Sequence, residues 1–530
     1  MPRAWQALFS CAAALLTLAL GAWAQAPKVG DWYKDSSDLG FQVRVPDDYQ
    51  LIPPDPNEGT VIAKFDPKIN KYVLVGSEEL FLHVWLLRFD ANAPKDGGKK
   101  PELKQRSKDV LAFLKREVQY GGAAKEASKK AFEVNKIPAT EYEYTALMGS
   151  EEVRIYAVQY KLNASTEVAW VGVGPGGKKW PKFQQPFQQM AKSFKTIEVK
   201  DTAPALSDGA SYRDKRRAEL LADVAKTNGV WKLYETPRYF IISDNTDKAF
   251  LDELKLRLEA IRDVYERDYP YEKMQEIKAA AAQARTGDGK EKDPAEEARK
   301  QAEKEFDKVI DGGVDPREAS KCSIVRVCKD QAEYHSYGGP GGSAGYWSPM
   351  AKELVLYDDK AQGGRGDTWA VLNHEGFHQY IYYLYGKLSP HSWYNEGTGD
   401  YYSGYQRQKT GRFELDKFAW RKDLIAQSVR EGKVVPLKEF VKLTQAEYYG
   451  TLDKYHTDVG IHYAQGWSFI YFLRTGKDKH AKGWNPAWEK ILDVYFQTLG
   501  ATEDLEQSVN KAFDGVDWDA LETAWKEYTK

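Results

Sequence analysis

Cysteine is scarce in this chain of 530 residues, which contains three. Cys11 lies in an apolar N-terminal segment, which leaves Cys322 and Cys328. No Cys-x-x-Cys spacing occurs between them, so we expect no cysteine-ligated zinc site. Two residues six apart on a straight strand lie ~20 Å apart, so a disulfide would need a bend in the chain. A disulfide and two buried free thiols are both compatible with the sequence.

An excess of charge of one sign is also absent, because the net charge is −2. A balanced chain has no general attraction for nucleic acid, and we expect none as a partner. At the N-terminus, Arg3 precedes an apolar run that ends at Ala22-Trp23-Ala24, a typical cleavage site. The run is short for a membrane span. We therefore expect residues 1–24 to be a cleaved signal peptide, the protein to be secreted or periplasmic, and no stable membrane span to remain.

The hydrophobic share of 42% and the charged share of 29% are those of a soluble globular protein. Strand-like alternation mixed with helical runs predicts an N-terminal α/β sandwich-like accessory domain at residues 28–200. The segment 201–212, rich in Ala, Ser, Asp and Pro, predicts a linker. Residues 213–530 predict a small sheet, a charged helical insertion at 275–310 and a largely helical second half. The predicted fold class is α+β.

Two segments of the accessory domain carry a resemblance. FQVRVPDDY near its start and the closing helix that leads into SFKTIEV resemble the PsbP/Mog1-type sandwich of exported modules. The resemblance implies a domain that binds a partner or a substrate. Within the domain, residues 72–89 predict two strands. In the second domain, residues 352–359 (KELVLYDD) alternate like an edge strand.

Histidine is scarce too, with eight in the chain, yet His374-Glu375-Gly376-Phe377-His378 places two of them in the pattern His-Glu-x-x-His. Residues four apart on a helix share a face, so both imidazoles reach one ion about 2.1 Å away. Glu375 lies roughly 100° around the helix and can take a proton from a zinc-activated water without binding the ion. Asp367 or Thr368 is the predicted N-cap. The motif predicts one Zn²⁺; the alternative is a set of buried structural side chains.

A third ligand is predicted at Glu396, within Trp-Tyr-Asn-Glu-Gly. A turn after the first helix would let a second, antiparallel helix bring Glu396 back to the ion. Asp400, one turn later on the same face, is suited to accept the outer N–H of a ligand histidine. Two alternatives are that Glu396 only interacts with the positive end of a helix, and that His391 replaces it.

HEGFH followed by WYNEG is similar to the gluzincins, the peptidase-MA-like zinc peptidases of the thermolysin and aminopeptidase-N class. The resemblance implies a zincin-type catalytic domain, with zinc held by His374, His378 and Glu396 and with Glu375 as general base. Downstream, the YAQG that begins at Tyr463 resembles the Tyr-x-x-Gly motif of the aminopeptidase-N class. This implies that Tyr463 donates a hydrogen bond to the oxyanion.

The resemblance extends over about residues 215–530. The Gly-x-Met-Glu-Asn segment of the aminopeptidases is missing, and GGSAGYWSPM stands in its place. The sequence therefore does not predict aminopeptidase activity, and it leaves cleavage at chain ends and at interior bonds both open. An extended peptide is expected to pair with the edge strand. The residues predicted to bind substrate are Gly345, Tyr346, Leu354, Val355 and Leu356.

Three other interpretations of the site compete with this one. A metzincin is excluded because Ile381 and Leu384 stand where its glycine and third histidine would be. An aspzincin remains possible, because Gly397-Thr398-Gly399-Asp400 mirrors Gly-Thr-x-Asp and would make Asp400 a zinc ligand. A non-catalytic binding protein on the zincin fold is the third. The sequence favours an exported zinc metallopeptidase that acts on a peptide or protein substrate.

Overall fold

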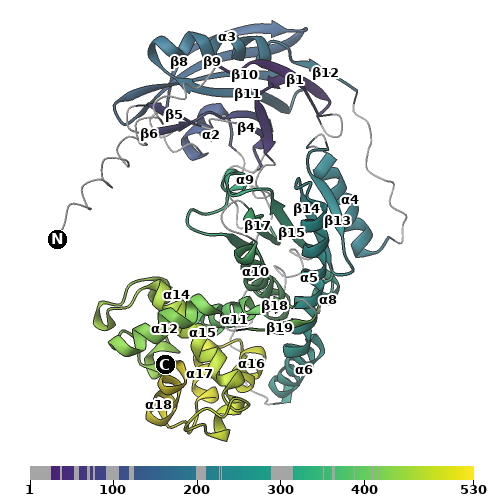
Figure 1. The fold of residues 1–530 in the computed structure, drawn as a ribbon. Coiled ribbons are helices and arrows are strands. Elements are labelled where there is room, and N and C mark those ends of the chain that lie inside the picture. Colours follow the sequence, from purple (N-terminus) through teal and green to yellow (C-terminus); the bar gives the residue numbers. More distant parts are fainter. Residues whose placement is uncertain are drawn as a thin grey trace, which may run out of the picture. The chain divides into compact units, whose positions relative to one another are not determined.

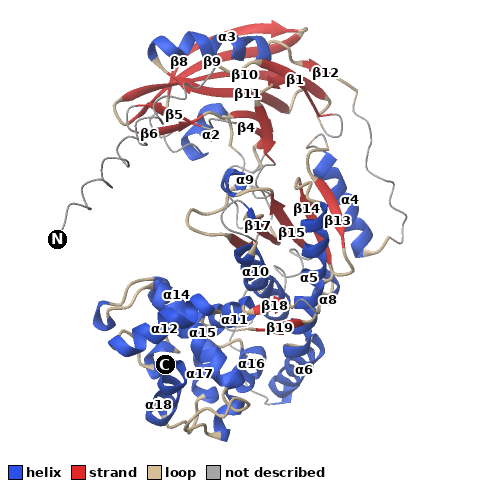
Figure 2. Cartoon of the chain, in the orientation of Figure 1, coloured by secondary structure: helices blue, strands red, loops and turns tan. Residues whose placement is uncertain are grey.

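The computed structural model describes residues 26–35, 39–52, 59–68, 72–75, 78–90, 107–117, 124–198, 210–225, 227, 229–287, 314–349, 351–360, 365–386, 388–408, 411–416 and 418–530. The predicted signal peptide, most of the predicted linker and residues 288–310 of the predicted insertion lie outside these ranges. The fold is α+β, with a sheet-rich N-terminal region and a helical C-terminal half (Figures 1 and 2). No helix within the described ranges combines the length and apolar composition that crossing a bilayer requires.

The chain forms two compact units. The first comprises Met1–Pro204 and Ala222–Val230, and the second comprises Ala205–Leu221 and Trp231–Lys530. One hydrophobic core cluster lies in the first unit, and two others lie in the second.

The first unit is built around a seven-stranded antiparallel sheet, in the order β3-β4-β7-β11-β10-β9-β8. Helix α3 covers one face, where the ring of Phe187 lies 5.2 Å from Trp170. The elements are β1 (Val29–Asp35), β2 (Phe41–Pro46), β3 (Tyr49–Ile52), β4 (Val61–Pro67), β5 (Tyr72–Val75), β6 (Glu78–Phe81), β7 (Val84–Asp90), α2 (Val110–Glu117), β8 (Lys125–Val134), β9 (Ile137–Met148), β10 (Glu151–Lys161), β11 (Thr166–Pro175), α3 (Trp180–Ala191) and β12 (Lys195–Thr196).

Residues 72–89 form three strands where two were predicted. The first stretch divides into the antiparallel pair β5 and β6, with Tyr72 opposite Phe81.

The second unit begins with a five-stranded sheet in the order β13-β14-β15-β17-β16. Strands β14, β15 and β17 are parallel, and β13 and β16 are antiparallel edges. The elements of this part are α4 (Tyr212–Ala225), which runs from the second unit into the first, β13 (Lys232–Glu235), β14 (Tyr239–Ser243), α5 (Lys248–Asp268), α6 (Tyr271–Gly287), α8 (Pro316–Ser320), β15 (Ser323–Cys328), α9 (Gln331–Tyr337), β16 (Gly345–Ser348) and β17 (Glu353–Tyr357).

From Gly366 onward the described chain is helical, apart from the short hairpin β18–β19 and the loops that connect the elements (Figure 2). The elements are α10 (Gly366–Tyr385), α11 (Ser392–Ser403), β18 (Tyr405–Arg407), β19 (Phe413–Leu415), α12 (Ala419–Glu431), α13 (Leu437–Phe440), α14 (Gln445–Tyr449), α15 (Val459–Thr475), α16 (Ile491–Thr502), α17 (Leu505–Ala512) and α18 (Trp518–Thr529).

Helix α10 begins earlier than predicted, at Gly366, and Arg365 occupies the N-cap without a side-chain hydrogen bond. The predicted cap Thr368 lies inside the helix, where its hydroxyl donates to the carbonyl of Tyr357 at 3.1 Å. The helix is also tied to the sheet by Gln379, whose Nε2 donates to the carbonyl of Ile324 at 2.9 Å. These contacts hold α10 against the end and face of the sheet.

Cys322 and Cys328 are both buried free thiols. Cys328 ends the regular strand β15, and Cys322 lies just before its first residue. A straight strand keeps the two sulfurs apart, because no bend separates them. Burial raises the pKa of both thiols.

Candidate metal centre

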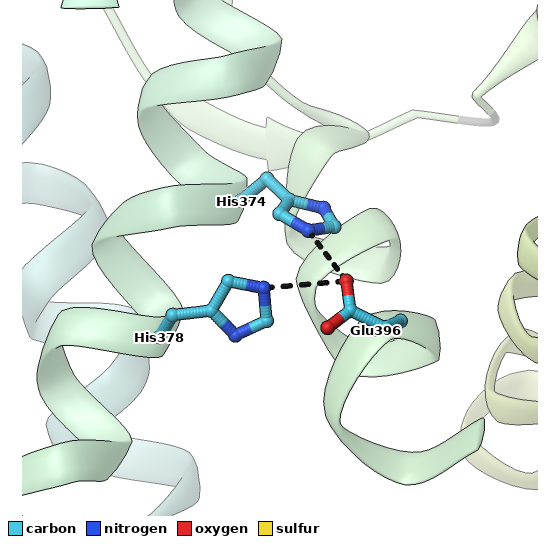
Figure 3. Close-up of side chains that lie close together, drawn as sticks. All are labelled: His374, His378 and Glu396. Atoms are coloured by element: carbon cyan, nitrogen blue, oxygen red, sulfur yellow. Dashed lines mark hydrogen bonds and ion pairs between the residues drawn. The ribbon is translucent and has the colours of Figure 1, made fainter. Parts of the chain in front are cut away.

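Two histidines of α10 project toward one carboxylate of α11 (Figure 3). Nε2 of His374 lies 3.1 Å from Oε2 of Glu396, and Nε2 of His378 lies 3.4 Å from the same oxygen. Among the residues that the structure describes, these form the one group of three or more His, Cys, Asp or Glu whose ligand atoms all lie within 4.8 Å of one another. The imidazoles are each 12% exposed, and the carboxylate is 7% exposed.

The geometry of the three side chains fits a zinc ion. Zinc bonds of about 2.0–2.2 Å in a tetrahedron place neighbouring ligand atoms about 3.3–3.6 Å apart. Of the two nitrogen–oxygen distances, 3.4 Å lies within that range and 3.1 Å lies just below it. Two imidazole nitrogens and a carboxylate oxygen are also a donor set that catalytic zinc sites use, with a fourth position for water.

The electrostatics of the site favour a cation. Burial lowers the pKa of His374, but the carboxylates of Asp400 and Glu396 outweigh it and raise that pKa well above its usual value. In the same way, Glu396 raises the pKa of His378 against the effect of burial. The two imidazoles hold the pKa of Glu396 well below its usual range although burial opposes this. The negative charge that stabilises imidazolium would equally stabilise a divalent ion.

The outer nitrogen of each ring faces an oxygen on α11. Nδ1 of His374 lies 3.0 Å from Oδ1 of Asp400, and Nδ1 of His378 lies 3.2 Å from Oδ1 of Asn395. Since these oxygens accept, Nδ1 donates in both cases and Nε2 is left to bind an ion. The pairing also shows that α10 and α11 run in opposite directions, as predicted for the two helices. Arg421 of α12 lies 2.6 Å from the other oxygen of Asp400.

Two glycines of α11 permit this close packing. A Cβ on Gly397 would lie 2.6 Å from the backbone carbonyl oxygen of Gly466 in α15. A Cβ on Gly399 would lie 2.8 Å from the ring of His374. Side chains at these positions would therefore push α11 away from α15 and from the first histidine.

Glu375 is fixed beside the two histidines by the edge strand. The backbone N–H of Trp347 in β16 donates to Oε2 of Glu375 at 2.9 Å. The negative charge of Glu375 contributes to the raised pKa of both His374 and His378. The role of Glu375 as proton acceptor for a water stays a prediction.

Tyr463 lies in the second turn of α15, next to the site. Its ring is 6.3 Å from that of His374, and the guanidinium of Arg421 lies 4.9 Å from its centre. Burial raises the pKa of Tyr463, and the charge of Glu396 raises it further. The phenol is therefore protonated and able to donate, and its predicted role with an oxyanion stays a prediction.

The prediction that residues 352–359 form an edge strand is wrong. Strand β17 lies between β15 and β16, and Leu354, Val355 and Leu356 are at most 1% exposed. These three residues therefore cannot bind a substrate by strand addition. The edge is β16, which carries the predicted residues Gly345 and Tyr346 and pairs with β17 in antiparallel register. The alternation within a strand does not reveal whether another strand pairs with its outer side.

Four residues at the site were not found from the sequence: Asn395, Arg421, Tyr449 and Trp347. Asn395 could have been found, because it precedes Glu396 directly in the motif. The others have no local signal, since they come from elements remote in the chain. The hydroxyl of Tyr449 in α14 donates to Oε1 of Glu396 at 2.8 Å.

No family model matches the sequence, and no curated protein matches it. Among solved structures, cyanobacterial PsbP from Synechocystis is 15% identical, with 34% of this chain and 99% of that chain covered, at a TM-score of 0.23. LpqN of Mycobacterium tuberculosis, involved in cell envelope biogenesis, is 8% identical, with 32% of this chain and 90% of that chain covered, at a TM-score of 0.21. A Bacteroides thetaiotaomicron protein is 9% identical, with 48% of this chain and 70% of that chain covered, at a TM-score of 0.21. TM-scores this low support no conclusion about fold or function.

Proposed function

We propose that the protein is an exported zinc-dependent metallopeptidase of the gluzincin class. One observation carries the proposal: a single carboxylate oxygen of Glu396 faces Nε2 of both His374 and His378, at distances close to those between two ligand atoms of one zinc ion. The His-Glu-x-x-His motif with a later glutamate is the pattern of that class, and the position of Glu375 beside the rings supports a hydrolytic use.

The chemistry divides among the side chains. His374, His378 and Glu396 would hold a zinc ion, which would supply an acidified water and polarise the carbonyl of the substrate. Glu375 takes the proton of the attacking water and passes it to the leaving amine. The N–H of Trp347 orients the Glu375 carboxylate for both transfers. Tyr463 donates its hydroxyl proton to the oxyanion in a hydrogen bond.

The position of Asp400 supports Glu396 as the third ligand. Asp400 contacts the outer nitrogen of His374 and Arg421, on the side away from the shared oxygen. An aspzincin arrangement would need this carboxylate on the Nε2 side of the ring.

Substrate is expected at the sheet edge. Strand β16, which carries Gly345 and Tyr346, ends the strand order of the sheet in the described chain and adjoins Glu375 through Trp347, and an extended peptide can add to a sheet at such an edge. A peptide paired there passes beside the proposed general base.

A peptide-library digest tests the proposal. The wild-type chain should cleave, a chelator should abolish cleavage, and Zn²⁺ should restore it. Glu375→Gln should bind zinc as the wild type does and lose roughly 10²–10⁴-fold in rate. Glu431→Gln, an exposed acid on α12, serves as the matched control. A wild-type chain that binds zinc but cleaves nothing would support the non-catalytic binding protein, and cleavage by Glu375→Gln at the wild-type rate would refute the general-base role.

A further inference from the structure

The carboxylate of Glu396 uses its two oxygens differently. Oε2 faces both imidazole nitrogens, at 3.1 and 3.4 Å, whereas Oε1 accepts a hydrogen bond from the hydroxyl of Tyr449 at 2.8 Å. A carboxylate binds a metal ion through one oxygen or through both. The hydrogen bond on Oε1 therefore bears on which of the two modes Glu396 adopts.

Tyr449 is held firmly although its ring is 42% exposed. It ends α14, which begins with a capping box between Thr444 and Glu447. Its neighbour Tyr448 is fully buried and donates its hydroxyl to the carbonyl of His462 at 3.1 Å. The chain directly before Tyr449 is thus anchored, and the hydroxyl of Tyr449 reaches a carboxylate that is only 7% exposed. A surface tyrosine would not need such an arrangement.

The hydrogen bond of Tyr449 completes a set. Each of the other two proposed ligands has an outer partner, and both of those partners belong to α11, the helix of Glu396 itself. Glu396 has its partner on a different helix, α14. Partners of this kind fix the orientation of a ligand and contribute to metal affinity.

Resting on the proposed function, we propose that Tyr449 is a positioning residue that holds Glu396 as a one-oxygen ligand. By occupying Oε1 it leaves Oε2 alone for the ion, so that the two imidazoles, one oxygen and one further position make a four-coordinate site. Such a site suits zinc and disfavours ions such as Ca²⁺ that take six to eight oxygen ligands. Without the hydroxyl, the carboxylate is free to rotate and bind through both oxygens.

The test compares Tyr449→Phe with Tyr455→Phe in the full chain. Tyr455 is a matched control, because its hydroxyl also donates to a glutamate, Glu439, on the exposed surface away from the ligands. The first measurement is the dissociation constant for Zn²⁺, by competition with a chromogenic chelator. The second is the visible absorption of Co²⁺ bound in place of zinc, whose intensity falls when a four-coordinate site gains a ligand.

Tyr449→Phe should raise the Zn²⁺ dissociation constant roughly 10- to 100-fold and weaken the Co²⁺ absorption, while circular dichroism stays unchanged. Tyr455→Phe should match the wild type in both. A Tyr449→Phe variant with wild-type affinity and an unchanged Co²⁺ spectrum overturns this inference alone and leaves the zinc peptidase intact. A wild-type chain that binds no zinc overturns both.

Discussion

At the scale of single residues, Asp400 shows how one side chain serves two neighbours. One oxygen faces Nδ1 of His374, and the other lies 2.6 Å from Nε of Arg421. The guanidinium in turn lies over the ring of Tyr463. The charge of this buried carboxylate therefore acts both on His374 of the candidate metal centre and on Arg421 of α12. Removing the charge should change how strongly His374 binds an ion.

Asp400→Asn should lower zinc affinity about tenfold, because a neutral amide no longer strengthens the donor capacity of His374. Chelator competition at fixed pH measures the change. Asp423→Asn, an exposed acid on α12, should leave the affinity unaltered. Equal affinities for wild type and Asp400→Asn would show that the charge of Asp400 does not reach the ion.

A second residue-scale effect lies away from the metal. Glu333 is fully buried, and burial together with the negative charge of Asp244 raises its pKa to about 8, although Lys329 opposes this. Nζ of Lys329 lies 3.1 Å from Glu333 and 3.0 Å from Asp244. In the unfolded chain the same carboxyl has a pKa of about 4.3.

When an acid has a higher pKa in the folded state than in the unfolded chain, the protein becomes less stable as the pH rises between the two values. The reason is that only the unfolded chain releases the proton in this range. Between about pH 5 and pH 8, the melting temperature of the wild type should therefore fall more steeply than that of Glu333→Gln. Thermal unfolding followed by circular dichroism across this range measures the difference. Parallel curves for the two proteins would contradict the raised pKa.

At the scale of elements, the edge strand β16 acts through its backbone. The N–H of Trp347 reaches Glu375, and this contact depends on the strand position, not on the indole. Trp347→Pro removes the donor and should lower kcat about tenfold or more, since a hydrogen bond to a charged group contributes about 1.5–3 kcal/mol. Trp347→Phe keeps the N–H and should retain most activity. Equal losses in both variants would mean that the ring matters instead.

The contact between α11 and α15 is the second element-scale feature, and it depends on Gly397. Gly397→Ala places a methyl group 2.6 Å from the backbone of Gly466, so α11 must shift. We expect a loss of about 1–3 kcal/mol in unfolding free energy, together with weaker zinc binding, since α11 carries Glu396. Gly341→Ala is the control, because a Cβ there meets no atom within 4 Å. Denaturant titration and chelator competition would detect both effects, and a Gly397→Ala protein like the wild type would refute the packing argument.

At the scale of the whole molecule, the candidate metal centre belongs to one unit. All three proposed ligands and their partners lie in the second unit, which contains two hydrophobic core clusters of its own. Residues 205–530 produced alone should therefore fold and bind one Zn²⁺ within about threefold of the affinity of the full chain. Residues 26–204 should bind none at comparable affinity. Isothermal titration of both fragments measures this, and a fragment 205–530 that folds but loses zinc binding would show that the first unit contributes to the site.

The α+β class and most elements followed from the sequence, because apolar periodicity is a local property. Strand β8 carries no such signal, since its Lys, Glu and Ala residues are exposed and lack alternation. The assignment of β17 as an edge strand was wrong because the residue pattern within a strand does not indicate how many other strands pair with it. The N-cap of α10 was misplaced because Thr368 bonds to the sheet and not to its own helix.

The sequence by itself determined the two helices and the spacing that turns His374, His378 and Glu396 toward one point. Those positions follow from helical periodicity and a short connection, which operate over a few turns of chain. Only the tertiary structure decided that Tyr449 and Trp347 reach the site, because they come from 53 and 28 positions away and arrive through packing. The choice of the three proposed ligands is a short-range property of this chain, whereas the hydrogen bonds that orient the glutamates depend on how the helices and the sheet pack around them.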